Sequence, residues 1–150
     1  MREALCTHIF LKQAVLGQKF TIKGNGEQSR NFVYIDDLVD GCVKAMTYLT
    51  DFSKGTNEIF NLVGRNSETI HSLARICYST VNGVMPVDII PYCEYLPWRE
   101  DDVITEDISI AKAQEKLGWT PNTNLYDGMK AIIKEWVNDG TITVSVKPHE

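Results

Sequence analysis

The stretch of residues 20–38 constrains this chain more than any other, because it reads as two short β-prone runs joined by a polar turn. The turn holds Gly24, Asn25 and Gly26, and glycine and asparagine tolerate the positive φ angles of tight turns. It places one guanidinium, that of Arg30, at the start of the second run. A guanidinium binds a carboxylate or a phosphate in a bidentate manner. Arg30 therefore either binds an anionic ligand or pairs with a nearby aspartate.

Residues 24–38 have the sequence GNGEQSRNFVYIDDL. This closely resembles a signature of the NAD-dependent epimerase/dehydratase family, the extended short-chain dehydrogenases that act on nucleotide sugars. The resemblance implies that Arg30 binds the diphosphate of a nucleotide sugar, either a UDP-sugar or a dTDP-sugar. Lys23 stands where a tyrosine often precedes Gly24 in the family, so the resemblance leaves recognition of the base open.

Two further residues of a nucleotide-sugar site are implied by the resemblance. Asn66 follows a run, residues 58–64, that is similar to a strand of the family, and it matches an asparagine that contacts the nucleotide in some dehydratases. A plain turn residue is the alternative. Arg99 matches the arginine of a family segment that also reaches the nucleotide. The proline and glycine of that segment are missing here, however, and three carboxylates close to Arg99 compete for its charge.

Residues 109–121 resemble a structural segment of the same family, and the resemblance covers roughly residues 3 to 138. It implies the α/β class and a partial extended short-chain dehydrogenase fold. We expect a small mixed α/β substrate domain, with helices packed on short strands and the Rossmann half absent. The expected organisation is one domain over residues 1–150, with residues 139–150 as a loose tail.

Apolar spacing near 3.6 residues predicts helices over 3–16, 37–49, 70–81 and 125–138, and one that ends at Gly118. Predicted strands cover 20–22, 31–35, 58–63 and the proline-bounded run 86–91, and residues 92–106 are predicted as a loop. Residues 141–146 form either a strand or a frayed end. Asp36, Asp37 and Asp40 are predicted to cap the second helix and to favour its dipole rather than to bind a metal.

Composition excludes several classes of protein. An apolar content of 43% and a charged content of 23% are typical of globular proteins. The net charge of −5 argues against a nucleic-acid partner, and no apolar run is long enough to cross a membrane. The four cysteines are widely spaced and indicate reduced core thiols rather than a metal site. Together with an N-terminus unlike a signal peptide, they predict a cytoplasmic location.

Catalytic residues of the family are not found. Hydride chemistry needs a glycine-rich turn for NAD and a Tyr-x-x-x-Lys pair. The Gly24–Gly26 turn lies between two predicted strands, so we assign it no cofactor. The one matching pair, Tyr126 and Lys130, lies in the last helix and receives no catalytic role. We therefore expect NAD to belong to the parent family and not to this chain.

Three hypotheses follow. The first is the nucleotide-sugar-binding half of an epimerase or dehydratase, which does not turn over substrate alone. The second is an interaction module, because a half-domain exposes the 58–63 run and apolar helix faces that invite self-association or docking of a complementary Rossmann half. The third is a remnant without activity.

Overall fold

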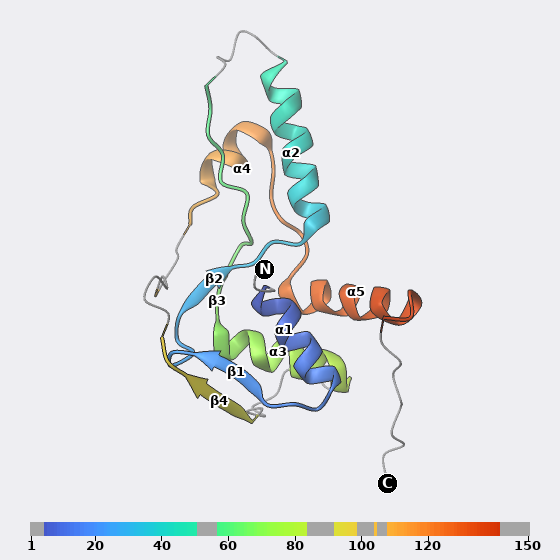
Figure 1. Cartoon of the computed structure of the whole chain (residues 1–150). Helices are drawn as coiled ribbons and strands as arrows, with labels where there is room; N and C mark the ends of the chain where they lie inside the picture. Colours follow the sequence, from blue (N-terminus) through green and yellow to red (C-terminus); the bar gives the residue numbers. More distant parts are fainter. Residues whose placement is uncertain (1–4, 51–56, 84–91, 99–103, 105–107, 142–150) are drawn as a thin grey trace. The chain divides into compact units, whose positions relative to one another are not determined.

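The computed structural model describes residues 5–50, 57–83, 92–98, 104 and 108–141, and it confirms the mixed α/β class. Within these residues five helices and four short strands are formed (Figure 1). In chain order they are α1 (Cys6–Val15), β1 (Phe20–Lys23), β2 (Ser29–Asn31), α2 (Ile35–Leu49), β3 (Ser67–Thr69), α3 (Ile70–Asn82), β4 (Cys93–Leu96), α4 (Ala111–Leu117) and α5 (Leu125–Asn138). They fall into two compact units, which are described separately.

The first unit comprises residues 1–27, 70–102 and 126–150, and its core lies where α1 and α3 pack beside β1. β1 pairs with β4 in parallel, with Phe20 opposite Cys93. Phe20 and Ile22 are buried whereas Thr21 and Lys23 are partly exposed, which is the alternation of a strand with one covered face. The ring of Phe20 meets that of Phe10 edge to face at 5.3 Å between centroids.

The second unit comprises residues 28–69 and 103–125. β2 pairs with β3 antiparallel, and α2 packs on α4. Trp119 is fully buried and belongs to the core of this unit. Gly118 ends α4 with a φ of 59°, the left-handed conformation that glycine adopts without strain.

The strand predictions fared worse than the helix predictions. The second predicted strand, residues 31–35, is wrong beyond Asn31, because the chain turns into α2 at Ile35. The predicted strand over 58–63 is also wrong, since this segment carries no strand ladder in the described structure. β4 lies within the predicted 92–106 loop. The run 86–91 and most of the predicted tail lie outside the described residues.

Two helices present unexpected faces. In α1 the buried residues are Phe10, Leu11 and Ala14, whereas Leu5 and Leu16, the cap residues at its two ends, are 78% and 56% exposed. In α2 the apolar residues Val39, Val43 and Met46, which recur at helical spacing, are 52%, 55% and 68% exposed. Gly41 is the buried position of that helix.

No helix in the described part of the chain combines the length and the apolar character that crossing a membrane requires.

Candidate functional site

Arg30 lies in the middle of β2, directly opposite Glu68 of β3. Opposite charges at facing positions of antiparallel strands attract one another across the ladder. The side chain is partly buried, and its Nη1 donates a hydrogen bond to the carbonyl of Ser29 at 2.7 Å. A guanidinium has five N–H donors, so this bond uses one of them. The ladder therefore fixes the position of the arginine that the sequence singled out.

Gly64 brings the segment before β3 against the residue after β2. A Cβ atom at this position would lie 1.8 Å from the carbonyl oxygen of Phe32, so only glycine fits. Nearby, the Nδ2 of Asn31 donates to the carbonyl of Gly64 at 3.2 Å. The Oδ1 of Asn31 is buried and accepts no hydrogen bond from the residues that the structure describes. These contacts close one wall of a cavity.

The cavity lies entirely within the second unit and has a volume of about 230 Å³. One wall carries Phe32, Gly64, Arg65, Asn66 and Glu68, and the other is formed by residues 121–125. Asn66, predicted as a site residue, thus lines a real cavity. Arg30 is not among the residues that line it, but its strand partner Glu68 is.

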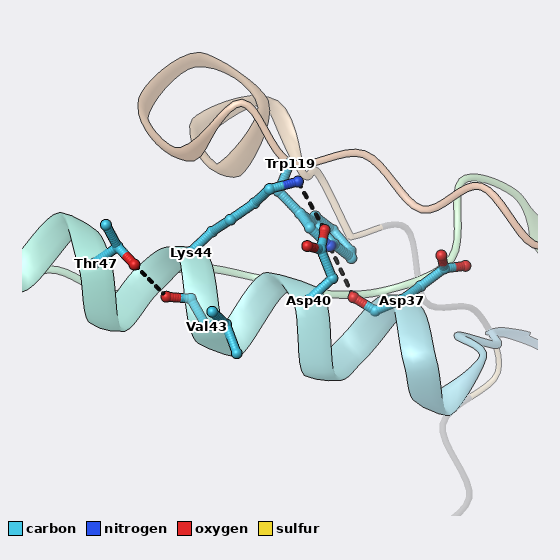
Figure 2. A network of polar contacts seen from close by, with 6 residues as sticks. All are labelled: Asp37, Asp40, Val43, Lys44, Thr47 and Trp119. Atoms are coloured by element: carbon cyan, nitrogen blue, oxygen red, sulfur yellow. Dashed lines mark hydrogen bonds and ion pairs between the residues drawn. The ribbon is translucent and has the colours of Figure 1, made fainter.

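Asp37 holds the second wall in place. Its carboxylate accepts a hydrogen bond from the backbone N–H of Thr123 at 2.8 Å. Its carbonyl accepts one from the indole Nε1 of Trp119, also at 2.8 Å (Figure 2). The N-cap position of α2 is Tyr34, which makes no capping side-chain bond. The prediction that Asp37 caps the helix is therefore corrected. It lies in the first turn, where an acidic group favours the dipole, but its hydrogen bond anchors a distant segment.

The remaining predicted residue, Arg99, lies outside the described residues. Arg65 is a cavity residue that the sequence reasoning missed as a ligand. The signal was present, because Arg65 stands between the close-approach Gly64 and the predicted Asn66. Asn122 and Asn124 were missed as well, since nothing local links residues 121–125 to β3.

The Gly24–Gly26 turn joins two strands, as the sequence predicted. It follows β1 and leads to β2, whereas a pyrophosphate loop joins a strand to a helix. A Cβ at Gly24 would meet the Trp98 side chain at 2.6 Å, and one at Gly26 would meet the His71 ring at 2.5 Å. The side chains of Trp98 and His71 therefore lie directly against these two glycines. Tyr126 and Lys130, the one Tyr-x-x-x-Lys spacing in the sequence, form a cation–π contact with 5.3 Å from Nζ to the ring centroid.

None of the four cysteines forms a disulfide in the described structure, and Cys77 is the one among them that is fully buried. Burial raises its pKa to about 12, with a smaller contribution from Cys6. Cys42 is exposed, so the prediction of a core thiol is wrong for that residue. The described residues hold no cluster of three or more histidine, cysteine or acidic side chains suited to a metal ion.

Comparison with known proteins identifies the family of this chain. The family model for GDP-mannose 4,6 dehydratase matches residues 3–132. The chain belongs to this family of NAD-dependent epimerases and dehydratases. The resemblance noted in the sequence is thereby confirmed.

Individual relatives in this family are enzymes of UDP-sugars. UDP-glucuronic acid decarboxylase 2 of Arabidopsis thaliana is 30% identical over 128 residues, which cover 85% of this chain and 26% of the relative. The structure of a Thermotoga maritima UDP-glucose 4-epimerase with UDP-glucose is 31% identical and covers 92% of this chain and 41% of its own, with a TM-score of 0.73. A Bacillus cereus UDP-glucuronic acid 4-epimerase, solved with UDP-glucuronic acid and NAD, is 25% identical and covers 90% and 41%, with a TM-score of 0.72.

The chain thus spans about a quarter of the length of the first curated relatives and about two fifths of these solved chains. The family's α/β fold is matched over nearly all of the chain, and most of each relative has no counterpart in it.

Proposed function

We propose that this chain is the nucleotide-sugar-binding portion of an NAD-dependent sugar epimerase or dehydratase and that it is not catalytic alone. Arg30 binds the diphosphate, and Asn66 and Arg99 assist. NAD and the group that transfers the proton belong to a complementary part of the enzyme. A UDP-sugar is the first choice of ligand, because the relatives named above act on or bind UDP-sugars, and a dTDP-sugar is the second. The proposal also includes the cytoplasmic location predicted from the reduced thiols.

The observation that supports the proposal best is the cavity beside the β2–β3 ladder, into which the predicted Asn66 falls. Its polar lining includes the Arg65 guanidinium and three asparagine side chains, which suit phosphate and hydroxyl groups. Small-molecule sites usually measure roughly 300–1,000 Å³. A cavity of about 230 Å³ therefore accommodates only a part of the ligand. The diphosphate itself lies next to the cavity, at Arg30, whose strand partner Glu68 is a lining residue.

Calorimetric titration of the chain with UDP-glucose, UDP-glucuronic acid and dTDP-glucose tests this. We expect binding at millimolar or lower concentration. Loss of a charged hydrogen bond costs about 1.5–3 kcal/mol, so Arg30→Ala should weaken binding by roughly tenfold or more. Arg75→Ala removes an equal charge from the exposed surface of α3 and should change nothing. Absence of binding to all three ligands, or an equal loss in Arg75→Ala, would contradict the proposal.

A second function is favoured by a separate observation. The apolar stripe of α2 contains Ile35, Val39, Val43 and Met46, which are 59%, 52%, 55% and 68% exposed. In the same unit Ile59 of the 58–63 run is 83% exposed. Contiguous apolar surface of this kind marks an interaction site. We therefore propose that α2 docks another polypeptide, either a second copy of the chain or the complementary Rossmann half.

A further inference from the structure

Three side chains of the first unit form a continuous chain of polar contacts. The Nδ1 of His71 lies 3.2 Å from the Oε1 of Glu27, and its Nε2 lies 2.9 Å from the phenolic oxygen of Tyr95. The imidazole and phenol rings meet edge to face, with 5.8 Å between centroids. Neither the cavity nor the proposed nucleotide-sugar residues include any of these three, so the inference does not rest on the proposed function.

The positions of the protons on these three side chains follow from which of their atoms can donate a hydrogen bond. An ionised carboxylate only accepts hydrogen bonds, so the N–H of a neutral His71 must be on Nδ1. Nε2 then carries the lone pair and accepts the hydrogen bond from the Tyr95 hydroxyl. An activated nucleophile is generally recognised by a hydrogen bond to a base, which is itself oriented by a third group.

The arrangement is held by the backbone as well as by side chains. The backbone N–H of His71 donates to the carbonyl of Gly26 at 3.1 Å. A Cβ on Gly26 would approach the Nε2 of His71 to 2.5 Å, so the imidazole sits in space that only glycine leaves. The turn, α3 and β4 thus each fix one member of the trio.

We propose that Tyr95 is a base-activated nucleophile that accepts acyl groups from activated acyl donors. Its oxygen attacks the acyl carbon, and the bond from that carbon to the leaving group breaks. The phenolic proton passes to Nε2 of His71, and the resulting imidazolium gives it to the leaving group. Glu27 is a positioning residue, which holds the tautomer and stabilises the imidazolium. The product is an acyl ester of Tyr95, whose side chain is accessible because the residue is 54% exposed.

Acetylation by N-acetylimidazole tests this on the full chain, with site-resolved rates from peptide mass spectrometry. Tyr92 is the internal control, because it is 70% exposed and lies three residues away, with Lys19 rather than a histidine against its ring. Exposure alone predicts that Tyr92 reacts faster. General-base assistance is worth about 10²–10⁴ in rate, and for this accessible site we expect Tyr95 to react roughly tenfold faster than Tyr92.

Variants separate activation from mere structure. His71→Gln keeps a hydrogen-bonding side chain but removes the base, and it should lower the Tyr95 rate to that of Tyr92. Glu27→Gln should give an intermediate rate. The absolute rate at Tyr92 distinguishes loss of the base from partial unfolding, because unfolding would raise the Tyr92 rate whereas loss of the base leaves it unchanged. Equal rates in the wild type, or a Tyr95 rate that His71→Gln leaves unchanged, would overturn the proposal.

Discussion

Glu58 is a single carboxylate that accepts contacts from two lysines of α4. Lys112 Nζ lies 2.7 Å from its Oε2, and Lys116 Nζ lies 2.5 Å from its Oε1. The hydrogen bond from Lys112, followed by that from Lys116, lowers the pKa of Glu58 from 4.5 to about 2. Because the folded pKa lies below the ordinary value, the contribution to stability is complete above pH 4.5 and is lost as the pH falls towards about 2.

We therefore predict that Glu58→Gln lowers the melting temperature at neutral pH and that the difference from the wild type shrinks as the pH falls from 4.5 to about 2. Thermal melts followed by circular dichroism over this range measure it. Glu115→Gln removes an exposed carboxylate from α4, the helix that carries the two lysines, and the melting temperature of this variant should follow that of the wild type. A difference that stays constant with pH would show that the lysine contacts do not set the effect.

Single residues were predictable from sequence where their role is local. Gly118 ends its helix as expected, because a glycine stop after a helical pattern is recognisable from neighbouring residues. Asp37 was not, since its partner Thr123 lies 86 positions away and no local pattern encodes that contact. The cavity residues were only half predictable for the same reason. Asn66 was found through a resemblance, whereas Asn122 and Asn124 reach the cavity through the anchored 119–123 segment.

Among the elements, the β2–β3 ladder depends on Gly64. An alanine there would place its Cβ 1.8 Å from the Phe32 carbonyl, and a backbone atom cannot rotate away as a side chain does. Overpacking typically costs about 1–3 kcal/mol, and for a clash with backbone we expect Gly64→Ala to cost about 3 kcal/mol or more. Chemical denaturation measures the total loss in the free energy of unfolding. Faster hydrogen exchange at residues 29–31 locates the damage at β2.

Gly83→Ala is the matched control for this substitution. Gly83 has a φ of 65°, and no atom lies within 4 Å of the place that an added methyl group would take. Alanine there meets only the cost of a left-handed residue, about 1–2 kcal/mol. Equal destabilisation by the two substitutions, with the exchange of residues 29–31 unchanged, would contradict the role given to the close approach.

Helices were predictable and strands were not, for a physical reason. The spacing of apolar residues encodes a helix within one segment, and α3 and α5 match their predicted bounds within a residue. A strand requires a partner, which sequence spacing does not name. Residues 58–63 have the composition of a buried strand yet form no ladder in the described structure, whereas the polar residues of β3 pair with β2.

For the molecule as a whole, the question is what covers α2. The helix places Gly41 against Trp119 and Leu62, and its opposite apolar stripe remains exposed. The exposed pair of Asp40 and Lys44, 2.7 Å apart, lies along the same helix (Figure 2). The chain spans about two fifths of the solved family members it matches. If α2 docks another polypeptide, as proposed, that polypeptide covers this apolar face.

We predict that the isolated chain self-associates through this stripe. Burying a valine or methionine side chain is worth about 1.5–3 kcal/mol, so Val43→Ser and Met46→Gln should each weaken association by roughly tenfold or more. Light scattering over a concentration series measures it. Lys44→Gln changes a polar residue of the same helix and should leave association intact. A wild-type chain that stays monomeric and melts cooperatively would exclude α2 as a self-association surface. The exposed apolar residues of α2 would then be ordinary protein surface, much of which is apolar in any folded protein.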